Sequence, residues 1–215
     1  MKKQLILSAI AAVALGAPVA SMAESLDFNY KVDRFADIEV LRYKVPDFEQ
    51  LTIQQKELVY YLTEAALYGR DILTDQNGKY NLAIRTTLEN IYKNYDGSKD
   101  DADYKGFVLY LKQVWFANGI HHHYSTDKFT PQFSQAFFET QVKKLSKKQL
   151  PLKKGQTVDA FLKEITPVIF DPTVMAKRVN QANGQDLILT SANNYYEGVT
   201  QAEVEQFYAA MKKTD

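Results

Sequence analysis

Residues 82–117, LAIRTTLENIYKNYDGSKDDADYKGFVLYLKQVWFA, decide the class of this fold. Hydrophobic residues recur every three or four positions over residues 82–95 and again over residues 104–117, which is the spacing of one face of an α-helix. The polar run Asp96–Asp103 between the two patterns predicts a loop. The stretch therefore predicts two amphipathic helices with these apolar faces: Ile84, Leu88, Ile91 and Tyr95 on the first, and Phe107, Tyr110, Leu111 and Val114 on the second.

Another helical pattern precedes this stretch. Thr52 followed by Gln55 is a capping-box signal, in which each side chain caps a backbone N–H of the other at the start of a helix. The run that follows predicts one long helix, closed by a turn at Asn77-Gly78, a pair that readily adopts positive φ. The apolar residues of this run fall at helical spacing and are expected to face the core: Leu58, Tyr61, Leu62, Ala65, Ile72 and Leu73.

Two short segments predict strands. Residues 36–45 begin with an alternation of apolar and polar residues and are rich in β-branched side chains. Pro46 is expected to end this strand, because proline has no N–H to donate to a neighbouring strand. Residues 186–190, DLILT, are the best candidate for a second strand.

The C-terminal half of the chain predicts three more helices, at about residues 131–145, 158–169 and 201–211. Thr200 followed by Glu203 gives the last of them a capping signal. Taken with the elements above, the sequence predicts an α+β fold that is mostly helical with a small β component.

The composition is that of a globular protein with no dominant charge. The 215-residue chain is 46% hydrophobic and carries 26 Lys and Arg against 26 Asp and Glu. A neutral chain creates no global field that would attract nucleic acid, so nucleic acid is not an expected partner, and a lysine-rich run near residues 143–154 predicts a solvated face. Because the chain has no cysteine, it has no disulfide framework.

Residues 1–23 have the three parts of a cleavable signal peptide. Lys2 and Lys3 give a positive start, an apolar stretch follows, and Ser21-Met22-Ala23 places small residues where a signal peptidase cleaves. The apolar stretch is too short for a stable membrane anchor, which needs about 20 apolar residues. We therefore expect an exported protein, periplasmic or secreted, whose mature chain spans residues 24–215.

Three consecutive histidines, His121–His123, suggest metal binding, since imidazole is a frequent ligand. However, adjacent residues of an extended segment point in alternating directions, so at most two of the three rings can meet one ion without strain. The sequence also lacks the H-E-x-x-H and H-E-x-x-x-H patterns of helical zinc peptidases. An aromatic, hydrogen-bonding loop that faces a cleft is the favoured interpretation, and no metal is expected to be bound by this chain.

Residues 108–133, VLYLKQVWFANGIHHHYSTDKFTPQF, resemble the N-terminal region of the dipeptidyl-peptidase III family in its bacterial, exported form. Supporting stretches lie at residues 35–45, 56–66, 69–73 and 190–199, so the resemblance covers nearly all of the mature chain. It is most specific over residues 115–129. Members of this family are zinc exopeptidases that release dipeptides from the N-terminus of oligopeptides, and they have two lobes around a wide cleft.

The resemblance implies that residues 24–215 are an incomplete part of the lower, β-barrel-containing lobe. The family's zinc helix lies later in the chain, in the other lobe, so the resemblance implies zinc in the full-length enzyme and no catalytic residue here. The implied partners are the oligopeptide substrate and the zinc-bearing remainder of the peptidase. The segment 118–129 corresponds to one border of the substrate pocket, with Tyr124 at the position of the family's pocket aromatic. The candidate substrate-binding residues are Asn118, Gly119, His121, His123 and Tyr124.

A second hypothesis comes from another class of protein. The chain would then be a self-contained, exported helical binding module that uses its histidine run as a ligand or metal surface. The two hypotheses differ in whether the reading frame continues into an H-E-x-x-x-H motif.

Overall fold

The computed structural model describes residues 28–211, which divide into two compact units between residues 51 and 52. The predicted signal peptide, residues 1–23, lies outside the described residues. The fold class is α+β, mostly helical with a small antiparallel sheet, as the sequence predicts. Among the described residues, no helix has both the length and the apolar character needed to span a membrane.

The first unit contains a two-stranded antiparallel hairpin, β1 (Lys31–Phe35) and β2 (Ile38–Leu41), followed by a short 3-10 helix at Phe48–Gln50. The strand predicted at residues 36–45 is therefore wrong in its bounds. Ala36 has a φ of 48° and forms the hairpin turn, so the strand begins after it. The alternation in the sequence comes from β2 alone, and its partner strand precedes the predicted segment.

The second unit is helical. Its elements are α2 (Ile53–Tyr68), α3 (Arg70–Gln76), α4 (Asn81–Asn94), α5 (Ala102–Ala117), α6 (Gln135–Lys144), a 3-10 helix (Lys147–Gln149), α7 (Val158–Phe170) and α8 (Gln201–Met211). The helix predictions are confirmed, with two corrections. The long helix expected after Thr52 is two helices, divided at Gly69, and the helix expected from about residue 131 begins only at Gln135, after the cap Ser134. The predicted capping box of Thr52 and Gln55 is present at the start of α2.

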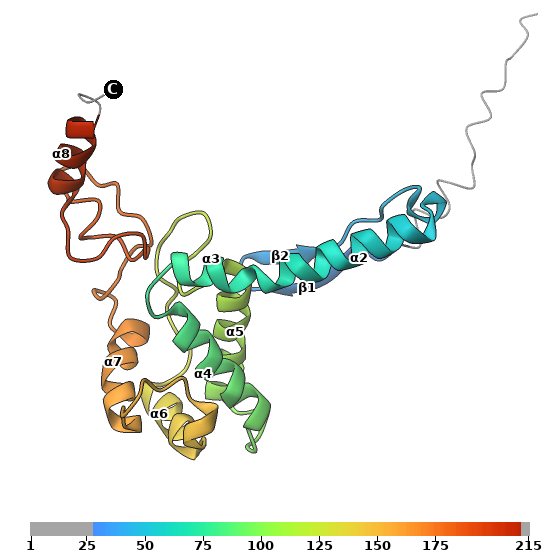
Figure 1. Ribbon diagram of the computed structural model, residues 1–215. Helices are drawn as coiled ribbons and strands as arrows, with labels where there is room; N and C mark the ends of the chain where they lie inside the picture. Colours follow the sequence, from blue (N-terminus) through green and yellow to red (C-terminus); the bar gives the residue numbers. More distant parts are fainter. Residues whose placement is uncertain (1–27, 212–215) are drawn as a thin grey trace, which may run out of the picture. The chain divides into compact units, whose positions relative to one another are not determined.

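The core lies between α4, α5, α6 and α7, which sit together in Figure 1. The apolar faces predicted for the two central helices are confirmed except at Tyr95, which follows the end of α4 and is only partly buried. Ile84, Leu88 and Ile91 of α4 are buried, and α5 contributes Phe107, Tyr110, Leu111 and Val114. Aromatic rings fill the space between helices: the ring centroids of Phe133 and Phe107 are 5.7 Å apart, and those of Phe133 and Phe170 are 5.4 Å apart.

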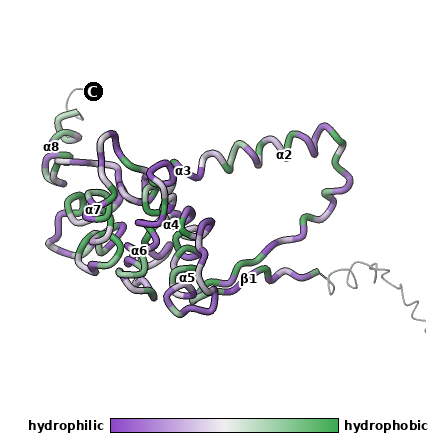
Figure 2. The backbone as a smooth tube through the Cα atoms, turned by 90° about the horizontal axis from the view of Figure 1, so that it is seen from below, coloured by the Kyte–Doolittle hydropathy of each residue, from purple (hydrophilic) through white to green (hydrophobic). Residues whose placement is uncertain are grey.

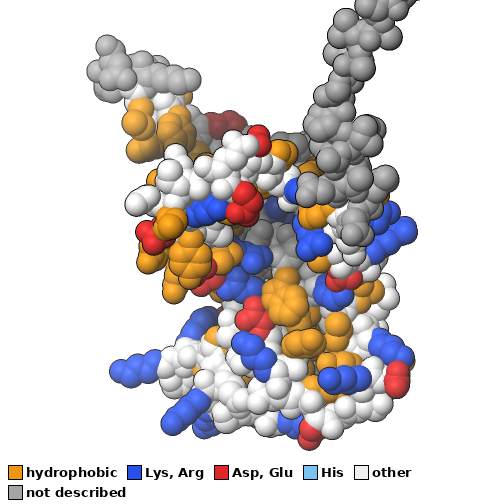
Figure 3. All heavy atoms as spheres, turned by 90° about the vertical axis from the view of Figure 1, so that its right-hand side faces the viewer, with side chains coloured by type: hydrophobic (Ala, Val, Ile, Leu, Met, Phe, Trp, Pro, Cys, Tyr) orange, Lys and Arg blue, Asp and Glu red, His pale blue; other side chains and the backbone are white. Residues whose placement is uncertain are grey.

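Helix α2 differs from its prediction. Hydrophobic residues recur along the helix (Figure 2). In the part of the chain that the structure describes, however, no side chain of α2 is buried. Leu58, Tyr61 and Leu62, which were expected in the core, are 58%, 68% and 60% exposed. Ile72 and Leu73 of α3 are exposed as well, and hydrophobic side chains reach the surface on the face shown in Figure 3. Helical spacing identified an apolar helix correctly, but it does not say which element covers it.

The second predicted strand, residues 186–190, is wrong: the segment is a turn. The side chain of Asp186 accepts hydrogen bonds from the backbone N–H groups of Ile188 and Leu189, each at 2.9 Å, and the Asp186 carbonyl accepts from Thr190. The carboxylate also accepts from the N–H of Gln201 at the start of α8. An aspartate that caps local N–H groups favours a turn over an extended strand, and these contacts hold the pKa of Asp186 below its ordinary value.

Candidate functional site

The candidate site is the loop between α5 and α6 (Figure 1), and it begins at the end of α5. Asn118 takes the left-handed conformation, with φ 52° and ψ 46°, and its N–H donates to the carbonyl of Val114. A left-handed residue after the last turn is a common way to end a helix, and asparagine tolerates that conformation better than most residues. The chain therefore leaves α5 in a fixed direction.

Two asparagines, one at the end of α3 and one at the start of α4, brace the start of this loop. The Nδ2 of Asn77 donates to the carbonyl of Asn118 at 3.1 Å, and the Oδ1 of Asn81 accepts from the N–H of Ile120 at 3.3 Å. The Asn81 side chain is buried and lies against Gly119, where a Cβ would come within 2.4 Å of its Nδ2. A side chain at residue 119 would therefore push Asn81 away from the loop.

The same asparagine explains the glycine of the Asn77-Gly78 turn. The turn forms where it was predicted, but Asn77 has a φ of −72°, so positive φ is not the reason for this residue pair. A Cβ at Gly78 would lie 2.8 Å from the Nδ2 of Asn81. Glycine at residue 78 thus leaves room for the asparagine that holds the loop.

Beyond Ile120 the loop folds back on itself and pairs with a later segment. His121 forms an antiparallel bridge with Lys128, and Asp127 forms one with Lys177. The N–H of Phe129 donates to the carbonyl of Ile120 at 2.9 Å, which closes the loop. An ion pair of 2.9 Å joins the side chains of Lys177 and Asp127 at the surface. Segment 120–129 is therefore a closed structure supported from two distant parts of the chain.

The three histidines lie in different environments. His121 is 2% exposed, and its Nε2 lies 2.7 Å from the carbonyl oxygen of Met175. The Nδ1 of His122 accepts from the N–H groups of Tyr124 and Ser125, at 3.2 and 3.1 Å, and shapes the turn. The ring of His123 packs edge-on against Phe116 at 5.0 Å. The structure thus places His121 in the interior and brings His123, not His121, to the face that carries Tyr124.

Of the candidate substrate-binding residues, Tyr124 is the most exposed, with 84% of its surface accessible. Its ring centroid lies 4.4 Å from that of His123, and the His123 carbonyl accepts a hydrogen bond from the guanidinium of Arg178 at 3.2 Å. The turn that carries the ring is held by these contacts and by the two hydrogen bonds to His122. A braced aromatic ring offers contact area to an apolar group at a low cost in conformational entropy.

Sequence reasoning missed Lys128, which fastens the loop to α7. Its ammonium donates to the carbonyls of Val168 and Val174, at 3.0 and 2.6 Å, and to the carbonyl of Asp171. A cation is favourable at a helix C-terminus, where carbonyl groups lack partners within the helix. Burial lowers the pKa of Lys128 below its ordinary value, and the Asp171 carboxylate opposes that shift.

Lys128→Met is expected to lower the free energy of unfolding by about 2 kcal/mol, because methionine keeps the apolar stem but leaves three carbonyls without their charged donor. Urea denaturation followed by circular dichroism measures the change. Lys177→Met is the matched control, since it breaks only the exposed ion pair to Asp127 and should cost less than about 1 kcal/mol. Equal losses for the two variants would contradict the role assigned to Lys128.

Burial lowers the pKa of His121 to about 4, from an ordinary value of 6.5, although the hydrogen bond to Met175 opposes the shift. The folded state therefore holds His121 neutral over a range in which the unfolded chain is protonated. The stability that depends on neutral His121 is complete above pH 6.5 and is lost as the pH falls toward about 4. The free energy of unfolding falls by about 3 kcal/mol in all, because each pKa unit corresponds to about 1.4 kcal/mol.

The expected result is that the free energy of unfolding falls between pH 6.5 and about 4 more steeply in the wild type than in His121→Gln. Glutamine can still donate to the Met175 carbonyl but takes up no proton. Urea titrations at several pH values measure both slopes, and other groups contribute equally to each protein. Parallel slopes would show that His121 is not held neutral by the fold.

The residues of this site offer no set of metal ligands. Within residues 28–211, the structure contains no group of three or more His, Asp or Glu side chains that could hold a metal ion. In comparisons with known proteins, no family model matches the chain, and no curated protein is significantly similar to it. The resemblance of residues 108–133 to a peptidase family therefore rests on the residues themselves.

Proposed function

We propose that this chain is the N-terminal part of an exported zinc dipeptidyl peptidase and forms one border of its peptide-binding cleft. The observation that carries the proposal is the loop 118–129, which bears the most specific part of the resemblance and presents an exposed, braced Tyr124. In this role the ring of Tyr124 contacts the apolar side chain at the start of the substrate. Gly119 and Asn118 set the loop's position, and His123 supports the ring.

The exposed apolar surface of α2 supports the proposal that this chain is one part of a larger enzyme. A helix whose leucine and tyrosine side chains all face water is marginal by itself, because most helical stability in proteins comes from tertiary packing. In the proposed enzyme, the remainder of the lobe covers α2. The catalytic zinc would be held in the remainder as well, by an H-E-x-x-x-H helix, a pattern that these 215 residues do not contain.

The reading frame that encodes this chain provides the first test. If the proposal is correct, it continues past the codon for Asp215 into an H-E-x-x-x-H motif, and the purified complete protein holds one zinc ion and releases dipeptides from dipeptidyl-arylamide substrates. A complete protein that has neither zinc nor this activity would refute the proposal. An active protein in which changes in loop 118–129 leave the kinetics unaltered would remove this loop from the cleft.

Export is the other part of the proposal. Protein recovered from the native host should begin at Glu24, because signal peptidase cleaves after small residues such as Ala23. Mass spectrometry of the intact protein measures the N-terminus, and a cytoplasmic expression of the same gene is the control, with residues 1–23 retained. Exported protein that still carries Met1 would contradict the signal peptide.

A further inference from the structure

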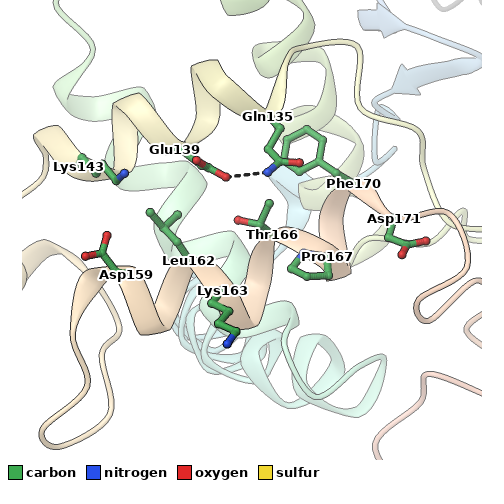
Figure 4. Close-up of a pocket in the computed structure, with 10 residues that line it drawn as sticks. All are labelled: Gln135, Glu139, Lys143, Asp159, Leu162, Lys163, Thr166, Pro167, Phe170 and Asp171. Atoms are coloured by element: carbon green, nitrogen blue, oxygen red, sulfur yellow. Dashed lines mark hydrogen bonds between the residues drawn. The ribbon is translucent and has the colours of Figure 1, made fainter.

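A groove between α6 and α7 has the features of a small-ligand site, and no residue of loop 118–129 lines it. Its cavity volume is about 550 Å³, within the usual range of about 300–1,000 Å³ for small-molecule sites. Figure 4 shows Gln135, Glu139 and Lys143 along α6 and the facing residues of α7. Leu162 and Phe170 give the groove an apolar part.

The charged side chains of this groove are not paired with each other. Glu139 accepts a hydrogen bond from the Nε2 of Gln135 at 2.7 Å, and among the described residues neither Glu139 nor Lys143 takes part in an ion pair. Other lysines nearby do find partners: Lys144 pairs with Asp96 at 2.9 Å, and Lys153 pairs with Glu164 at 2.6 Å. The groove therefore presents the carboxylates of Glu139 and Asp159 and the ammonium of Lys143 to a ligand.

A buried hydroxyl group without a hydrogen-bond partner is a second, independent indication that this groove binds a ligand. Thr166 is 6% exposed, and its Oγ1 has no hydrogen-bond partner among the described residues. The buried threonines Thr74 and Thr87, also in helices, donate to the carbonyl four residues earlier, at 3.0 and 2.7 Å. In Figure 4, Thr166 points from α7 toward Gln135 and Glu139. A buried polar group without a partner is costly, and a ligand that supplies the partner removes that cost.

We propose that this groove binds a small zwitterion of the amino-acid type with an apolar side chain. The ligand's ammonium takes the place of the Gln135 amide on Glu139 and gains the Thr166 oxygen as a second acceptor. Lys143, one helical turn and about 6 Å further along α6, receives the carboxylate, and the apolar side chain lies on Leu162 and Phe170. This site is separate from the proposed peptidase function and does not depend on it.

Ligand chemistry and variants together test the site. Chemical shifts of the purified ¹⁵N-labelled chain are followed by NMR during titration with L-leucine, N-acetyl-L-leucine (no ammonium), L-leucinamide (no carboxylate) and glycyl-L-leucine. Leucine or glycyl-leucine should give saturable shifts at residues of α6 and α7, and the two blocked compounds should bind about tenfold more weakly. The zwitterion that binds with the lower Kd identifies the natural ligand as a free amino acid, if it is leucine, or as a short peptide, if it is glycyl-leucine.

Three variants assign the contacts. Glu139→Gln and Lys143→Gln should each weaken binding of the zwitterion about tenfold. Thr166→Val should weaken it several-fold without lowering the melting temperature, because valine removes a hydroxyl that has no partner in the free protein. Lys163→Gln is the control, since Figure 4 shows Lys163 pointing away from α6. The absence of saturable shifts, or equal affinities in Glu139→Gln, Lys143→Gln and the control, would overturn the proposal.

Discussion

Gly106→Ala is expected to lower the free energy of unfolding by about 2 kcal/mol or more, although Gly106 lies inside helix α5. Helix propensity alone favours alanine over glycine by about 1 kcal/mol. However, a Cβ at residue 106 would lie 1.8 Å from the carbonyl oxygen of Gln132. That oxygen belongs to the backbone and cannot rotate away, so α5 and the chain before α6 must separate. Phe133, whose ring packs against Phe107 and Tyr110, would shift with it.

Urea denaturation of the purified chain measures this effect, and Gly69→Ala is the matched control. Gly69 has an ordinary φ of −71°, and a Cβ there would meet only the Ala66 carbonyl oxygen, at 3.3 Å. This substitution should be neutral or slightly stabilising, because alanine favours the helical conformation. A stabilised Gly106→Ala protein would show that the close approach of α5 to Gln132 does not exist in solution.

Tyr124→Ala in the complete, active protein is expected to lower kcat/KM about ten- to a hundredfold. The expectation rests on the proposed function. Burial of an aromatic ring against a ligand contributes about 1.5–3 kcal/mol, and loss of that contact converts into this factor. Because the contact exists in both the ground state and the transition state, the loss should fall mainly on KM. The fold should tolerate the change, since the ring is 84% exposed in the isolated chain.

Steady-state kinetics on peptides with large and small first residues provide the measurement. Tyr124→Phe is the control: it keeps the ring and should remain within about threefold of the wild type unless the hydroxyl acquires a partner in the complete enzyme. The loss in Tyr124→Ala should be greatest for the large, apolar first residue. Unchanged kinetics on every peptide would place Tyr124 outside the substrate pocket.

Much of the helical structure could be predicted because its signals are local. The capping pairs Thr52–Gln55 and Thr200–Glu203 both form, and each involves residues only three positions apart. The apolar stripes of α4 and α5 face the core as their spacing indicates. The strand predictions were weaker, because a strand needs a partner and short apolar runs also occur in turns. Residues 186–190 became a turn through the local capping by Asp186.

The candidate site could be predicted only in part. The sequence singled out loop 118–129, and the structure gives that loop a defined form with Tyr124 exposed. The sequence offers no reason to expect His121 to be buried and His123 to be partly exposed, since three identical residues in a row carry no local sign of burial. The roles of Asn77 and Asn81 could not be predicted either, because asparagines near a turn are common and the partners of these two lie about forty residues later in the chain.

The sequence by itself determined where this chain is helical and which helix faces are apolar, since both depend on residues within one or two turns of each other. Tertiary structure decided the rest through contacts between distant residues. The backbone of Gln132 approaches residue 106 so closely that only glycine fits there. Tertiary packing also buries His121 against the Met175 carbonyl and brings Lys128 to the carbonyls at the end of α7. Such contacts depend on how helices pack in space, and no periodicity along the chain encodes the identity of a partner tens of residues away.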